Sequence, residues 1–261
     1  MIQAIPYNKF EIENLKVSVY ANRMEMGHAA ATEAADRINE LLAAKDGIIS
    51  IVFAAAPSQN EFLQHLSRNT SINWGRIIAF HMDEYVGIDT QAPQSFSSFL
   101  RKSIFEKVPL HAVHYINGSA ADVEAECGRY TQLLKQYPPD IVCMGIGENT
   151  HIAFNDPYIA DFNDPQLVKT VTLDLASREQ QVHDGCFPEL SAVPVKAITL
   201  TVPALMQGTT LFCMVPGRNK AKPIYQTLYD EVSNATPSTA LRTHADARLY
   251  IDVDSASQLN L

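Results

Sequence analysis

The sequence predicts an α/β fold in which helices cover both faces of a doubly wound, mostly parallel sheet, in the Rossmann-like manner. Strand-like and helix-like segments alternate along the chain, which is typical of βαβ units with right-handed crossovers. The segment "DIVCMGI" (140–146) is a continuous apolar run, as expected of a parallel strand covered on both faces. Hydrophobic residues make up 46% and charged residues 19% of the 261 residues, which allows a substantial buried core.

The first half of the chain contains one long amphipathic segment and several shorter ones. Residues 22–45 carry apolar side chains at helical spacing, with Asn22 as a possible N-cap and Gly47 just past the end. The segments predicted after it are, in order, a strand at 47–56, a helix at 58–68 with Ser58 near its cap, a strand at 76–82, and helices at 95–108 and 120–137.

The second half continues the alternation. Its predicted elements are strands at 140–146, 197–202, 209–215 and 247–253, and a helix at 219–232. Pro223 is expected in the first turn of that helix, where a missing N–H costs little. A single α/β domain spanning residues 1–261 is the simplest division of the chain.

Bulk properties exclude several classes of function. A net charge of −9 argues against nucleic-acid binding, which needs a basic surface. The sequence contains no run of 18 apolar residues, so no membrane span is predicted. The N-terminal segment lacks a secretory or transit pattern. We therefore expect a cytoplasmic protein. Its four cysteines are far apart and form no CxxC pair, so we expect neither a metal site nor a redox site: Cys127, Cys143, Cys186 and Cys213.

Four predicted strands are followed directly by polar segments. These are "AAAPSQ" after residues 48–53, "MDEY" after 76–81, "GENTHIAFND" after 140–146 and "PGRNKAK" after 209–215. In open parallel sheets ligands bind beyond the carboxyl ends of the strands, so all four segments should face one crevice. They would bring together side chains that can bind an anion and move protons, namely Ser58, Asp83, Glu84, His151 and Lys220.

Four of the polar residues in these segments also have a purely structural interpretation. Asp83 could cap the turn after its strand, and His151 could be a core histidine with one hydrogen bond. Asp156, before Pro157, could start a turn, and Lys220 could be a solvated residue at a helix start. A cation is unfavourable at a helix N-terminus, however, unless an anion is shared there. Agreement among the four strand ends favours a functional site.

Two segments resemble a known family. "FHMDEYVGI" (80–88) and "GIGENTHIAFNDP" (145–157) are similar to the two signature segments of glucosamine-6-phosphate deaminases, also called isomerases. That family belongs to a superfamily shared with 6-phosphogluconolactonases. The resemblance runs from about residue 15 to the C-terminus and implies an enzyme that converts glucosamine 6-phosphate and water to fructose 6-phosphate and ammonia, without a redox cofactor.

The resemblance also implies roles for individual residues. Asp83 would carry the proton between C2 and C1, and His151 would open the sugar ring, oriented by Asp156 and Asn149. Lys220 would bind the phosphate with Ser58 and the backbone of Ala55 and Ala56. Apart from the resemblance, Glu84 is expected in the substrate-binding set because it lies next to Asp83 at the same strand end. A small sugar phosphate is then the expected partner. The family contains both monomers and hexamers, so a homo-oligomer stays open.

The chain departs from the family pattern at four points. The phosphate loop "AAAPSQ" lacks the usual glycine, Thr150 stands where glycine is usual, and Asp156 replaces a glutamate. A phosphate-binding arginine beyond the second signature has no clear match, since that region offers only Lys169. These departures affect substrate binding more than proton transfer. Two alternatives therefore stay open: a lactonase-like hydrolase, and a sugar-phosphate sensor that has lost turnover.

Overall fold

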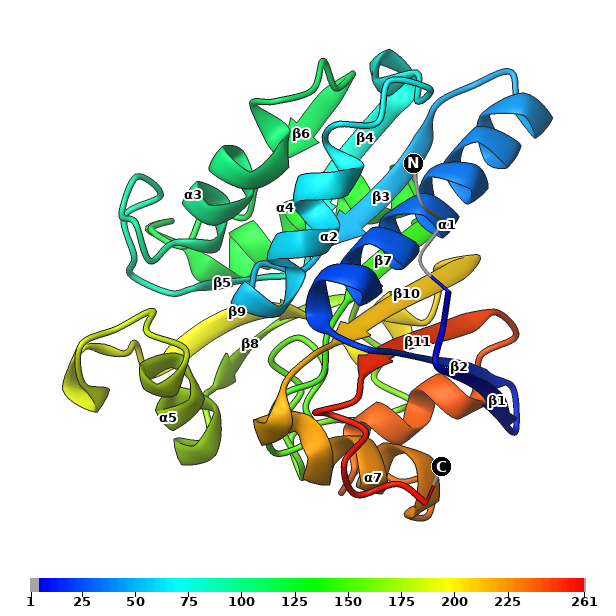
Figure 1. Cartoon of the computed structure of the whole chain (residues 1–261). Coiled ribbons are helices and arrows are strands. Elements are labelled where there is room, and N and C mark those ends of the chain that lie inside the picture. The colour runs from blue at the N-terminus through cyan, green and yellow to red at the C-terminus, as the bar shows by residue number, and fades with distance from the viewer. Residues whose placement is uncertain (1–4, 261) are drawn as a thin grey trace.

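An eight-stranded sheet forms the centre of the molecule (Figure 1), which is described by a computed structural model over residues 5–260. Neighbouring strands run parallel, except that the strand at one edge, Asn8–Ile12, is antiparallel to its neighbour. In spatial order the strands are β1 (Asn8–Ile12), β2 (Leu15–Tyr20), β11 (Ala247–Asp252), β10 (Thr210–Val215), β7 (Ile141–Met144), β3 (Ile49–Phe53), β4 (Ile77–His81) and β6 (Ala112–His114).

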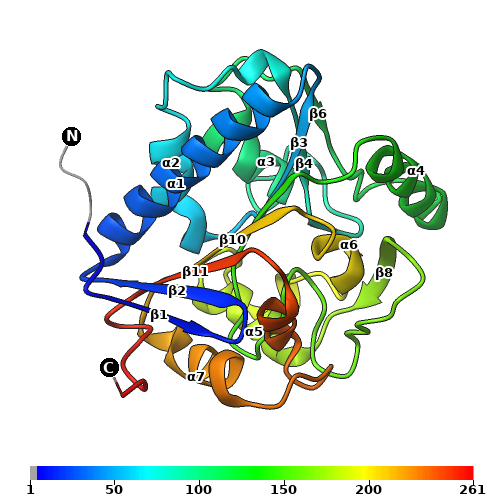
Figure 2. The same ribbon diagram turned by 90° about the vertical axis from the view of Figure 1, so that its right-hand side faces the viewer.

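Helices pack on both faces of this sheet, as the sequence predicts. Figure 2 shows α1 (Arg23–Ala44) and α2 (Asn60–Leu66) on one side, and α4 (Val123–Gln136) and α6 (Val202–Leu205) on the other. The Asn22 side chain caps α1, accepting a hydrogen bond from the backbone N of Glu25 at 2.9 Å. The remaining helices are α3 (Phe96–Leu100), α5 (Leu175–His183) and α7 (Ala221–Tyr229).

A second sheet of three short antiparallel strands was not predicted. It consists of β5 (Asp83–Tyr85), β9 (Lys196–Leu200) and β8 (Val168–Thr172), with β9 in the middle. The strand predicted at 197–202 exists as β9, but it belongs to this sheet and not to the parallel one. The chain passes from β4 to β5 through Met82 alone, so Asp83 lies where the two sheets meet.

Several predicted boundaries need correction. The helix predicted at 95–108 is α3 followed by a π-helical turn over Arg101–Phe105. Ser58 does not cap α2, because a 3₁₀ turn over Pro57–Gln59 precedes that helix. A similar 3₁₀ turn precedes α7, and Pro223 lies in the first turn of α7, as predicted. No helix of the described chain is long and apolar enough to span a membrane.

Close packing of α1 on α2 sets the position of the turn that precedes α2. Gly27 of α1 faces α2, and a Cβ atom there would lie 2.5 Å from Cβ of Glu61 and 2.9 Å from the backbone N of Phe62. Both distances are shorter than real contacts, so the helices approach this closely only because residue 27 has no side chain. The 57–59 turn is held against the start of α1 as a result.

We predict that Gly27→Ala destabilises the protein by roughly 1–3 kcal/mol, because the added methyl forces α2 away from α1. Gly128→Ala, in the middle of α4, is the matched control. A Cβ atom at Gly128 meets nothing within 4 Å, so alanine there should stabilise the protein by about 0.5–1 kcal/mol through helix propensity. Urea unfolding measures both, and equal effects at the two sites would contradict the packing account.

Candidate active site

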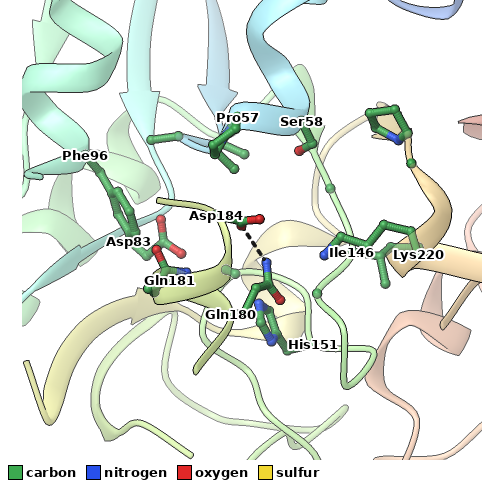
Figure 3. A pocket seen from close by; sticks show the side chains of 18 of the residues that line it. Pro57, Ser58, Asp83, Phe96, Ile146, His151, Gln180, Gln181, Asp184 and Lys220 are labelled. Carbon is green, nitrogen blue, oxygen red and sulfur yellow. Dashed lines mark hydrogen bonds between the residues drawn. The ribbon is translucent and has the colours of Figure 1, made fainter. Parts of the chain in front are cut away.

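A cavity opens at the carboxyl ends of β3, β4, β7 and β10, where the strand-end rule predicts it (Figure 3). Each of these strands contributes expected site residues to the lining. They are Ala55, Ala56 and Ser58 after β3, Asp83 after β4, His151 after β7, and Lys220 after β10. Asn149, Asp156 and Glu84 do not line the cavity.

Asp83 is a carboxylic acid in an environment that disfavours its charged form. Its side chain lines the cavity, but the residue is only 7% exposed. Burial, and next the nearby carboxylate of Glu84, raise the pKa of Asp83 well above its ordinary value. The backbone is fixed by His81, whose Nε2 accepts from the N–H of Ile116 at 2.8 Å, so that Nδ1–H donates to the carbonyl of Asp83 at 2.9 Å.

Glu84 has a structural role, which corrects its expected place among the substrate-binding residues. The residue is fully buried and its carboxylate turns toward the start of α3. It accepts hydrogen bonds from the backbone N of Phe96 and of Ser97, and from the hydroxyls of Ser95 and Ser97, at 2.8–3.1 Å. Successive residues of a strand point to opposite sides, so Asp83 and Glu84 cannot face the same cavity.

The imidazole of His151 is held by a network of oxygen atoms around Nδ1. Oδ1 of Asn149 lies 2.7 Å from Nδ1, and Oγ of Ser177 lies 2.8 Å from it. Oδ1 of Asn149 also accepts from the backbone N of His151, and the Ser177 hydroxyl donates to Asp156. Both oxygens therefore accept from Nδ1–H, so Nε2 is the ring nitrogen that is free to exchange a proton in the cavity.

Asp156 lies behind the imidazole as the expected orienting carboxylate. Its Oδ1 is 3.3 Å from Nδ1 of His151 and accepts from Nδ2 of Asn149 at 3.1 Å. Burial alone would raise the pKa of Asp156, but the contact with His151, through hydrogen bonding and charge, and hydrogen bonds from Ser177 and Asn149 outweigh burial and hold it at about 2. The carboxylate stays ionised and stabilises positive charge on the ring.

The glycine at 147 is required by the position of this ring. A Cβ atom at Gly147 would lie 2.1–2.4 Å from three ring atoms of His151. Any side chain at position 147 would therefore displace the imidazole. This explains the glycine ahead of the polar run, since the backbone has to pass directly against the ring.

The other end of the cavity presents a buried cation. Lys220 is 5% exposed, and its Nζ makes no hydrogen bond or ion pair with another described residue. Burial lowers the pKa of Lys220, opposed by the carboxylates of Asp184 and Glu148. The Ser58 oxygen accepts from Nε2 of Gln59 at 3.0 Å, so its O–H remains able to donate. An anion from solution would supply the partner that the lysine lacks.

Helix α5, which sequence patterns did not predict, contributes three residues to the site, and its C-cap residue contributes a fourth. Ser177 orients His151, while Gln180, Gln181 and Asp184 line the cavity. Gln181 is 8% exposed and its side chain makes no hydrogen bond within the described chain, so its amide is available to a ligand. The sequence feature that could have predicted this helix is Asp174. It is the N-cap residue, and its side chain accepts a hydrogen bond from the backbone N of Ala176 at 2.5 Å.

Thr150 adopts a conformation that normally favours glycine. Its φ is +72°, and its buried hydroxyl has no hydrogen-bond partner among the described residues. Its carbonyl accepts from the N of Ser238 at 3.0 Å, which anchors the loop before His151. Thr150 does not line the cavity, so the sequence departure strains the backbone without narrowing the site.

Comparison with known proteins agrees with this architecture. A family model described as glucosamine-6-phosphate isomerases/6-phosphogluconolactonase matches residues 21–250. A glucosamine-6-phosphate deaminase of Streptococcus sanguinis is 30% identical over 94% of this chain and 99% of its own length. One from Halothermothrix orenii is 30% identical over 94% of this chain and its own full length.

Solved structures show the same fold. A monomeric glucosamine-6-phosphate deaminase of the NagB superfamily superposes with a TM-score of 0.84 at 28% identity, covering 93% of this chain and 99% of its own. A 6-phosphogluconolactonase from Thermotoga maritima gives a TM-score of 0.73 at 20% identity, covering 91% of this chain and 99% of its own. At that identity the lactonase likeness extends to the fold alone.

We predict that Thr150→Gly stabilises the protein by about 1 kcal/mol, because glycine removes the cost of a left-handed β-branched residue. Thr150→Ala is the control, since alanine removes the unpaired hydroxyl but keeps most of the backbone strain. Urea unfolding of the two variants separates these effects. A glycine variant no more stable than the alanine variant would rule out stored strain at this position.

A second prediction concerns Asp156 and acid. Because the pKa of Asp156 is lowered in the folded state, its stabilising contribution is present above the ordinary carboxylate pKa and is lost as the pH falls from about 4 to 2. Asp156→Asn should cost about 2 kcal/mol near neutral pH, and the difference from wild type should shrink over that acid range. A pH-independent difference in unfolding free energy would contradict the network around His151.

Proposed function

The chain belongs to the family of glucosamine-6-phosphate isomerases and 6-phosphogluconolactonases, and on this premise we propose that it is an enzyme of the deaminase type. It converts an amino sugar phosphate, with glucosamine 6-phosphate as the first candidate, to a ketose phosphate and ammonia. The reaction belongs to carbohydrate metabolism. The four free cysteines support a reducing, cytoplasmic setting.

One observation carries the proposal: a carboxyl group and an imidazole open onto the same cavity as a buried lysine (Figure 3). The substrate has one group for each of them. Its phosphate suits Lys220, its ring oxygen and O1 suit His151, and its C2–H suits Asp83. A set of this kind can hold one end of a sugar while protons move at the other.

Ring opening is the first step, and His151 is suited to perform it. Nε2 accepts the proton of the O1 hydroxyl and returns it to the ring oxygen, which gives the open-chain aldehyde. The imidazole carries a positive charge between these two transfers, and the ionised Asp156 behind the ring stabilises that charge. No proton is gained or lost overall.

Proton transfer between carbons is the second step. The carboxylate of Asp83 takes the proton from C2, and the substrate's ammonium group gives a proton to O1, which leaves an enol with the amine on C2. Asp83 then delivers its proton to C1. The product is an imine at C2, to which water adds before ammonia leaves, so that substrate plus water yields ketose phosphate plus ammonia. Burial suits Asp83 to this task, because a raised pKa makes its carboxylate a stronger base.

A lactone hydrolase is the weaker candidate for this site. Hydrolysis of a lactone breaks a C–O bond and requires no proton transfer from carbon. The deaminase reaction, in contrast, requires a base at C2, which a buried carboxyl group of raised pKa in the cavity can provide. The chemistry available at Asp83 therefore supports the deaminase proposal.

We predict that Asp83→Asn lowers kcat for ammonia release from glucosamine 6-phosphate by about 10²–10⁴-fold, because the amide cannot accept the C2 proton. In the wild type, activity should fall on the acid side through the raised pKa of Asp83, since only the ionised form is a base. An ammonia assay across pH measures both. Wild-type protein whose melting temperature rises with the sugar phosphate but which forms no product would support the sensor alternative instead.

The same variant should be more stable than wild type. A raised folded-state pKa means that the contribution of Asp83 to stability is full below its ordinary pKa and is lost as the pH rises through the raised value. The neutral amide keeps that contribution, so the gain in melting temperature should increase with pH. An Asp83→Asn variant that melts lower than wild type at neutral pH would show that the carboxylate is not disfavoured by burial.

A further inference from the structure

The cavity wall beside Ser58 contains an arginine that lies outside both signature segments. Arg23, the first residue of α1, lines the cavity. Its Nε donates to Oε1 of Glu61 at 2.8 Å, and its Nη2 donates to Oε2 of Glu61 at 2.9 Å and to the carbonyl of Pro57 at 2.8 Å. The guanidinium is therefore fixed against the turn that carries Ser58, and Nη1 has no partner within the described chain.

The part of the cavity near Lys220 is short of positive charge for a phosphate. Apart from Arg23, Lys220 is the only lysine or arginine of the described residues that lines the cavity, and Asp184 lines it as well. Lys169, the residue nearest in sequence to the missing family arginine, does not line it. Its Nζ instead binds Oδ2 of Asp164 at 2.7 Å and the carbonyl of Ile159 at 3.3 Å.

The loop after β3 does not make up this shortage with a ring of backbone N–H groups. Ala56 is extended, with φ −151° and ψ 155°, and neither it nor Ala55 has a positive φ. An anion-binding nest requires successive residues with right-handed and left-handed backbone conformations, and these two residues do not have them. A phosphate monoester with nearly two negative charges needs further donors from side chains.

We propose that Arg23 binds the phosphate of the substrate, together with Lys220 and Ser58. The inference rests on the proposed function and names a residue of α1 as a determinant of specificity for the phosphorylated sugar. Glu61 and Pro57 hold the guanidinium in one orientation, so little side-chain entropy is lost when Nη1 donates to a phosphate oxygen. The two N–H bonds of Nη1 then replace donors that the glycine-free loop does not offer.

The test measures binding of inorganic phosphate to the full chain by titration calorimetry, which requires no turnover. Arg23→Gln should weaken binding by about tenfold or more, as expected for the loss of a charge-assisted hydrogen bond, and Arg23→Lys should have an intermediate effect. In steady-state assays Arg23→Gln should raise KM for glucosamine 6-phosphate and leave kcat within about threefold, because Arg23 acts far from the reacting carbons.

Arg129→Gln is the matched control. Arg129 pairs with Glu126 on α4, outside the cavity, and its side chain is 47% exposed against 44% for Arg23. Both substitutions remove one half of an ion pair, so a loss of phosphate affinity caused only by local destabilisation should appear in both. An Arg23→Gln variant that binds phosphate within twofold of the Arg129→Gln variant overturns the proposal, as does a wild type that binds no phosphate. Absence of ammonia release alone would count against the proposed function and not against this role of Arg23.

Discussion

The chain crosses from the parallel sheet to the antiparallel sheet within one residue, and the site depends on that crossing. Met82 separates β4 from β5, and its carbonyl accepts from the N of Leu200 at 2.8 Å. Asp83 then pairs with Thr199 of β9. The hydroxyl of Thr199 accepts from the N of Phe154 at 3.0 Å, three residues after His151. Strand β9 thus connects the segment that carries the carboxyl group to the loop that carries the imidazole, and fixes their separation.

Burial gives the charged groups of the cavity their chemical character. It raises the pKa of Asp83 and lowers the pKa of Lys220, so both shift toward their neutral forms. The pKa of Asp156 shifts in the other direction, because its contacts with His151, Ser177 and Asn149 outweigh its burial. The phosphate of a substrate would provide a negatively charged partner for Lys220. Perturbed pKa values gathered in one cavity are typical of a functional site.

Sequence patterns predicted the parallel sheet and most of the cavity, because strands and strand ends leave strong local signals. Hydrophobic runs located β3, β4, β7 and β10, and the residues after them line the cavity. The antiparallel sheet was missed because β5 has three residues and β8 is only partly buried, so neither has a clear hydrophobic pattern. Glu84 was assigned to the site by adjacency to Asp83, although alternation along a strand excludes it. Arg23 lies far in sequence from any strand end considered, and only the packing of α1 on α2 brings it to the cavity.

The central claim is that one cavity holds the phosphate at Lys220 while C2 of the sugar faces Asp83 and the ring oxygen faces His151. A crystal structure of the Asp83→Asn variant with glucosamine 6-phosphate tests this most directly, since the substrate should accumulate there unconverted. The account predicts the phosphate at Lys220, C2 next to residue 83 and the ring oxygen or O1 within hydrogen-bonding distance of Nε2 of His151. A sugar bound in the opposite direction, or outside this cavity, would contradict it.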